Sequence, residues 1–111
     1  MSNYAVLAAR LQNELHKLTQ VVSTATGQVQ KAQQTGDEDY IQAAALSLQN
    51  YDMGAERMFE AIAKQLDGSL PTGANSHQAL LEQMSFEIPN QRPAVITADT
   101  AVSLNEYRTF R

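Results

Sequence analysis

The feature that most constrains the fold is an unbroken series of apolar or small residues, three or four positions apart, in the first third of the chain. The series comprises Tyr4, Ala8, Leu11, Leu15, Leu18, Val22, Ala25, Val29 and Ala32. This spacing places every member on one face of an α-helix, whereas a strand has a period of two. A helix over residues 4–34 would be roughly 45 Å long at about 1.5 Å per residue, so it needs a partner of similar length.

The segment 35–37, Thr-Gly-Asp, predicts a helix end followed directly by a helix start. Gly36 can adopt the left-handed conformation that closes a helix, and Asp37 can cap the next one. A second stripe with helical spacing occupies residues 41–66 and stops before Gly68. Because the link is so short, we expect the two helices to form an antiparallel hairpin.

The second half of the chain predicts two further helices. The loop 69–76 precedes a short third helix, capped by Asn75 or Ser76, which should end before Pro89. Pro93 suits the first turn of a fourth helix, whose face would carry Ile96, Thr100, Leu104, Tyr107 and Arg111. We therefore expect an all-α, up-and-down antiparallel four-helix bundle, in which the two N-terminal helices are long, the third is short and the fourth is C-terminal. A single domain should span residues 1–111.

Composition and charge exclude several classes of protein. The chain has no cysteine, which excludes disulfides and thiolate chemistry. Charged residues interrupt the first twenty positions, so neither a signal peptide nor a membrane span is expected, and we expect a cytoplasmic protein. Net charge is −4; residues 1–36 carry three cations and one acid, whereas residues 37–68 carry seven acids and two cations. This distribution disfavours broad electrostatic capture of nucleic acid.

Metal and cofactor sites are not expected. A di-iron bundle needs Glu-x-x-His pairs, and the sequence contains none. The acids of segment 37–39 could bind a hard cation, but acids at a helix start are more simply explained by the helix dipole. His77, at the start of the third helix, could be catalytic; we favour a structural role in which the imidazole packs beneath the loop and donates one hydrogen bond.

Aromatic residues allow two further readings. Tyr51, Met58 and Phe59 could line a ligand pocket, although a core or a dimer seam is the commoner explanation for their spacing. Tyr107 and Arg108 belong to a basic and aromatic C-terminal segment that suits phosphate contact and base stacking, so they are candidate RNA-binding residues. The alternative is that these cations only complement the C-terminal end of the helix dipole.

Three stretches resemble the HepT-like helical family: His-x-x-Leu-Leu-x-x-Met at 77–84, Arg-Pro at 92–93 and Phe-Arg at 110–111. The resemblance implies a helical homodimer related to toxin ribonucleases, whose antitoxin partner is a minimal nucleotidyltransferase. The family's active motif is R-x4-H-x-Y, and only its arginine finds a position here, at Arg111. The resemblance therefore implies Arg111 as a catalytic residue, and we expect no RNA cleavage from these 111 residues.

A second hypothesis is a non-catalytic interaction protein, either a homodimer or a partner for a nucleotidyltransferase. The first two helices are long and apolar along one face, whereas the third helix is short. Part of the long helices should therefore remain open to a second copy of the chain.

Overall fold

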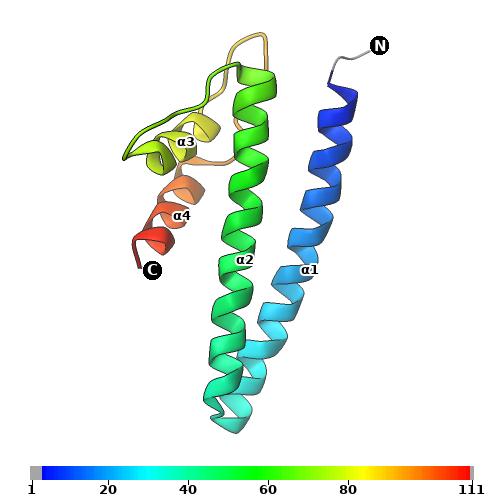
Figure 1. The fold of residues 1–111 in the computed structure, drawn as a ribbon, viewed down its shortest axis with the longest axis vertical. Coiled ribbons are helices and arrows are strands. Elements are labelled where there is room, and N and C mark those ends of the chain that lie inside the picture. The colour runs from blue at the N-terminus through cyan, green and yellow to red at the C-terminus, as the bar shows by residue number, and fades with distance from the viewer. Residues whose placement is uncertain (1–3, 111) are drawn as a thin grey trace. The chain divides into compact units, whose positions relative to one another are not determined.

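The computed structural model describes residues 4–110, and regular structure over that range is helical, apart from one isolated antiparallel bridge between Ile88 and Arg92. Its elements are α1 (Ala5–Thr35), α2 (Glu38–Ile62), the π-helical turn η1 (Ala63–Asp67), α3 (Ser76–Ser85) and α4 (Ala98–Phe110) (Figure 1). The predicted all-α fold, with two long N-terminal helices, a short third helix and a C-terminal helix, is confirmed. None of the helices between residues 4 and 110 combines the length and apolar character needed to cross a bilayer.

The chain forms two compact units, and the boundary between them falls within α2. The first unit extends to Met58, and the second begins at Phe59. The first is the helical hairpin of α1 with most of α2, and the second contains the end of α2, η1, α3 and α4. A single domain over residues 1–111 stays a prediction.

The hairpin of the first unit turns where the sequence predicts it (Figure 1). Gly36 has a φ of 70°, and its N–H donates to the Ala32 carbonyl at 2.8 Å. Asp37 then caps α2, because its Oδ1 accepts a hydrogen bond from the N–H of Asp39 at 2.9 Å. These bonds satisfy backbone groups that both helix ends would otherwise leave without partners.

The buried apolar residues of the hairpin are small or aliphatic. Leu18 and Ala25 of α1 and Ala44 and Ala55 of α2 are buried. Gly54 lies close to Leu18, since a Cβ at Gly54 would be 2.7 Å from the leucine Cδ2. The missing side chain at Gly54 therefore leaves room for the Leu18 side chain of α1 to pack directly on α2.

Only part of the predicted α1 stripe is buried. Leu18 and Ala25, seven residues apart, form an inner row, whereas Leu15, Val22 and Val29 form an outer row that is 57%, 48% and 42% exposed. Positions with a spacing of seven fall nearly above one another on a helix, so the stripe is wide enough to hold both rows. The sequence pattern places all these residues on one apolar face, but only the inner row of that face is buried in the hairpin.

The second unit begins with an irregular helix end. α2 changes to the π-helical turn η1, and Gly68 follows with a φ of 73° and donates its N–H to the Ala63 carbonyl. The predicted end of the second helix at Gly68 is confirmed, but its last turn is wider than an α-helical turn. This widened turn carries Asp67, which is central to the second unit.

The fourth helix begins later than the sequence predicts. The expectation that Pro93 lies in its first turn, with Ile96 on its face, is wrong, because α4 starts at Ala98. The Met84 carbonyl accepts the N–H of Val95 at 2.8 Å and that of Ile96 at 3.2 Å, which holds this segment as a loop. The helix start is instead provided by a threonine cap, in which the Thr97 hydroxyl accepts the N–H of Thr100 at 3.0 Å.

Candidate functional site

Two helix ends meet in the second unit and bring a histidine to an arginine. α3 and α4 pack side by side (Figure 1). His77 lies in the first turn of α3 and Arg108 in the last turn of α4, and Arg108 Nη2 is 2.6 Å from His77 Nε2. A guanidinium only donates hydrogen bonds, so this contact assigns His77 Nε2 as the acceptor and its ring proton to Nδ1. The pair, called the His77–Arg108 corner below, places the guanidinium of Arg108 against the imidazole ring of His77.

His77 and Arg108, which the sequence does not connect, are in contact in the structure. His77 does make a side-chain hydrogen bond, but its ring nitrogen accepts that bond from Arg108. The sequence gives no sign of this pairing, because the two residues are 31 positions apart and each is explained by its own helix end. Tyr107 and Arg108 are both partly buried on α4. Arg111 lies outside the residues that the structure describes, so its predicted catalytic role stays a prediction.

A shallow cleft lies between α3 and α4. It is lined by Gln78, Leu81, Glu82, Ala101, Val102 and Asn105. Gln78 follows His77 in the chain, and Asn105 precedes Arg108 by three residues, so the cleft adjoins the His77–Arg108 corner. The cleft therefore places two amides and one carboxylate beside a cation and an imidazole.

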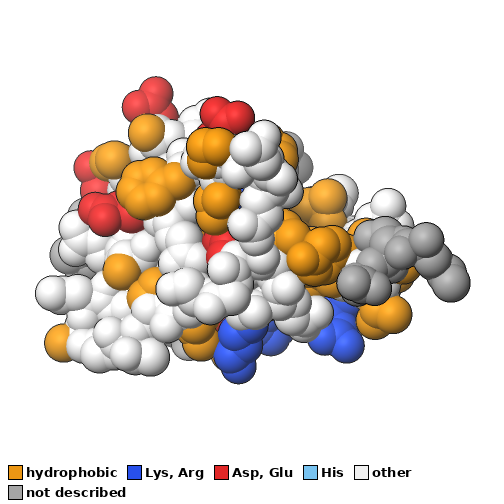
Figure 2. Space-filling model, turned by 90° about the horizontal axis from the view of Figure 1, so that it is seen from above, with side chains coloured by type: hydrophobic (Ala, Val, Ile, Leu, Met, Phe, Trp, Pro, Cys, Tyr) orange, Lys and Arg blue, Asp and Glu red, His pale blue; other side chains and the backbone are white. Residues whose placement is uncertain are grey.

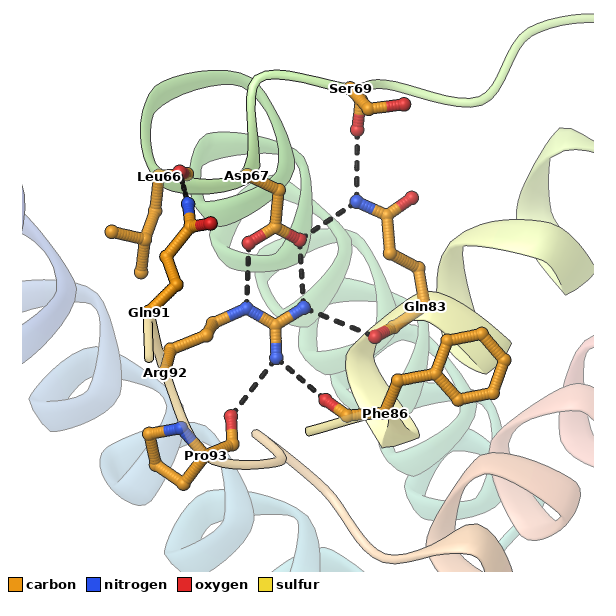
Figure 3. Close-up of polar contacts among 8 residues, drawn as sticks. All are labelled: Leu66, Asp67, Ser69, Gln83, Phe86, Gln91, Arg92 and Pro93. Atoms are coloured by element: carbon orange, nitrogen blue, oxygen red, sulfur yellow. Dashed lines mark hydrogen bonds and ion pairs between the residues drawn. The ribbon is translucent and has the colours of Figure 1, made fainter. Parts of the chain in front are cut away.

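A second polar group of the same unit, centred on Arg92, is fully engaged (Figure 3). Arg92 Nε lies 2.6 Å from Asp67 Oδ1, and Nη2 lies 2.7 Å from Oδ2, which is a bidentate ion pair. The side chains of the two residues are only 4% and 2% exposed. The guanidinium also donates to the carbonyls of Gln83, Phe86 and Pro93 at 2.9 to 3.1 Å.

Side-chain amides complete this Arg92 network. Gln83 Nε2 donates to Asp67 Oδ2 at 2.8 Å and to the Ser69 carbonyl at 2.9 Å. The side chain of Gln91 donates to the Leu66 carbonyl. The network thus ties η1 and the residue Ser69 after it to the end of α3 and to the loop before α4. Because the side chains of Arg92 and Asp67 are buried and hydrogen-bonded to each other, we assign the network a structural role in supporting the helices of the corner.

The ion pair shifts the proton affinity of both partners. The hydrogen bond from Arg92 lowers the pKa of Asp67 below its usual value; burial opposes this shift, and the hydrogen bond from Gln83 adds to it. The same hydrogen bond raises the pKa of Arg92. Asp67 therefore remains a carboxylate in the folded protein down to a lower pH than it does in the unfolded chain.

We expect this shift to make the fold sensitive to acid. The ionised form of Asp67 stabilises the protein at every pH above the carboxyl's unfolded pKa of about 3.9, and that contribution is lost as pH falls through the lower folded value. Urea unfolding of the wild-type protein at a series of pH values should therefore show a loss of stability below about pH 4 that Asp67→Asn lacks. Parallel pH profiles for the two proteins would contradict this prediction.

Within residues 4–110, no three histidine, aspartate or glutamate side chains are grouped so that they could hold a metal ion.

Comparison with known proteins identifies the family of the chain. A family model described as HepT-like protein matches residues 43–111, which is more than half of the chain and includes α3, α4 and the Arg92 network. Searches of curated proteins and of solved structures found no match.

Proposed function

Because this chain belongs to the HepT-like protein family, we propose that it is related to the toxin ribonucleases of toxin–antitoxin pairs and that it binds RNA at the His77–Arg108 corner. The observation that carries the proposal is the 2.6 Å contact between Arg108 Nη2 and His77 Nε2. It joins the two kinds of group that metal-free RNA chemistry uses, a cation for the phosphate and an imidazole beside it.

The corner suits a phosphate for a simple electrostatic reason. Arg108 presents a planar fork of N–H donors, one of which is directed at a neutral ring nitrogen. A phosphate oxygen is a charged acceptor and competes well with a neutral nitrogen, since charge-assisted hydrogen bonds are the stronger ones. Tyr107, next to Arg108, supplies an aromatic ring on the same helix turn for stacking with a base.

Removing the cation should weaken RNA binding. Fluorescence anisotropy with a labelled single-stranded 12-nucleotide RNA should show about a tenfold or greater loss of affinity for Arg108→Ala, because a hydrogen bond to a charged group contributes about 1.5–3 kcal/mol. The slope of log affinity against log salt concentration should also fall by about one.

Arg10→Ala is the matched control, because it removes the same charge from an exposed position on α1. It should change the affinity less than about twofold if binding is local to the corner. An equal loss in both variants, with unchanged helical circular dichroism, would indicate non-specific attraction and contradict the proposal.

The second candidate function is a helical interaction protein that forms a homodimer or binds a minimal nucleotidyltransferase. The exposed outer row Leu15, Val22 and Val29 favours it. Beside this row is an open, almost wholly apolar groove of about 230 Å³, lined by Val21, Val22, Ala25, Thr26, Val29, Leu48 and Tyr51. In a space-filling view, hydrophobic side chains reach the surface at several places among polar ones (Figure 2). The lining of the groove is a contiguous apolar surface, which is typical of an interface.

Light scattering coupled to size-exclusion chromatography tests the homodimer, because it measures the mass of the protein in solution. Wild-type protein at high micromolar concentration should have twice the mass of the chain, and Val22→Glu should reduce it to the mass of one chain, because a dimer would bury this position. A wild-type monomer would exclude the homodimer. A mixture with a minimal nucleotidyltransferase then tests the other partner.

A further inference from the structure

The cleft between α3 and α4 is lined by both polar and apolar side chains. Gln78 and Glu82 are four residues apart on α3 and therefore project from the same face of the helix. Asn105 contributes a second amide from α4. The remaining lining side chains, Leu81, Ala101 and Val102, are apolar.

These groups define the occupant that the cleft can recognise. An amide both donates and accepts hydrogen bonds, whereas the Glu82 carboxylate only accepts them. The best match has a flat apolar body for contact with Leu81 and Val102, and an edge that carries both an amino donor and ring acceptors. Adenine and cytosine have this combination, because their exocyclic amino group lies beside an unprotonated ring nitrogen on the Watson–Crick edge, whereas guanine has a protonated ring nitrogen beside its amino group there. Amides and carboxylates are side chains that read such edges.

The position of the cleft relative to the corner agrees with a nucleotide. Asn105 precedes Arg108 by three residues, which is about 4.5 Å along α4 at about 1.5 Å per residue. Gln78 is the neighbour of His77 on the opposite helix. A base seated in the cleft would thus have its own phosphate at the level of Arg108.

We propose that the α3–α4 cleft is a subsite for one unpaired adenine or cytosine of the RNA whose phosphate is held by Arg108. This inference rests on the proposed RNA binding and adds a base preference to it. Glu82 is the residue that sets the preference, because its carboxylate accepts from the amino group of adenine or cytosine. Uracil presents a carbonyl oxygen at the corresponding edge, which leaves two acceptors facing each other without a proton.

The test compares four labelled eight-nucleotide probes by fluorescence anisotropy: oligo(A), oligo(C), oligo(U) and an abasic ribose-phosphate oligomer. Oligo(A) and oligo(C) should bind about tenfold more tightly than the other two probes, in line with the discrimination that one well-placed base contact provides. In nuclear magnetic resonance spectra of the ¹⁵N-labelled protein, oligo(C) should shift the side-chain amide signal of Gln78. The abasic oligomer should leave that signal in place.

Glu82→Gln should bring the affinity for oligo(U) within about twofold of that for oligo(C), since the amide can donate to a carbonyl. Glu87→Gln is the matched control on another exposed acid of the same unit, and it should retain the preference. Equal binding of all four probes would overturn the base subsite and leave phosphate binding at the corner intact. Absence of binding by every probe would overturn the proposed RNA binding, and the subsite with it.

Discussion

Replacing Arg92 by methionine is expected to lower the free energy of unfolding by about 3–5 kcal/mol, the usual cost of breaking a buried ion pair on one side. Asp67 would be left as a buried carboxylate that keeps only the amide of Gln83 as a side-chain donor. The carbonyls of Phe86 and Pro93 would also lose the donor that Arg92 provides. Urea unfolding followed by circular dichroism at pH 7 measures the loss.

Two further variants test whether the loss of stability comes from leaving a buried charge without its partner. Asp67→Leu combined with Arg92→Met should lose less stability than Arg92→Met alone, because it leaves no buried charge. Arg57→Met should cost no more than about 1 kcal/mol, because Arg57 is an exposed residue whose pair with Glu14 spans 3.7 Å. A loss for Arg92→Met as small as that for Arg57→Met would show that the Arg92 network does not hold the second unit together.

Truncation of Met84 to alanine should cost about 2–5 kcal/mol. Met84 has 0% exposure, so its truncation leaves a cavity in the second unit. Its carbonyl also anchors the loop before α4 through Val95 and Ile96, so repacking around the cavity would disturb that loop. Urea unfolding followed by circular dichroism measures this loss of unfolding free energy.

Two controls test whether the Met84 effect comes from volume and burial. Met84→Leu nearly conserves side-chain volume and should cost less than about 1.5 kcal/mol. Met53→Ala, at a position that is 47% exposed on α2, should stay within about 0.5 kcal/mol of the wild type. Similar losses for Met84→Ala and Met53→Ala would contradict the central place of Met84 in the packing.

The hairpin could be predicted from the sequence because its determinants are local. The helical spacing along α1 and the Gly36–Asp37 link act over three or four residues, and the structure confirms both. The spacing could not show that only the row containing Leu18 and Ala25 would be buried, because burial depends on which part of a wide stripe faces the neighbouring helix.

The start of α4 could not be predicted because it depends on contacts between distant segments. Pro93 fits a first helical turn as well as it fits a loop. The choice is made by the carbonyl of Met84, which accepts the N–H groups of Val95 and Ile96, and by the cap that Thr97 supplies. Intrinsic helix-start preferences are smaller than the combined effect of such bonds.

The polar pairs of the second unit could not be predicted from the sequence either, because they also depend on contacts between distant segments. Asp67 and Arg92 are 25 residues apart, and His77 and Arg108 are 31 residues apart. Each residue has an ordinary explanation where it stands: Asp67 as a helix-end acid, Arg92 as a loop cation, His77 as a helix-start side chain and Arg108 as a helix-end cation. Only packing of α3 with α4, and of α3 with η1, brings the partners together.

Photo-cross-linking of single-stranded RNA to the protein, followed by mass spectrometry of the peptides, tests most directly whether the His77–Arg108 corner binds RNA. We expect the RNA to attach to the peptide that contains Tyr107 and Arg108, and we expect this product to be lost in Arg108→Ala. Cross-links confined to α1, or equal yields from the wild type and Arg108→Ala, would contradict RNA binding at this corner.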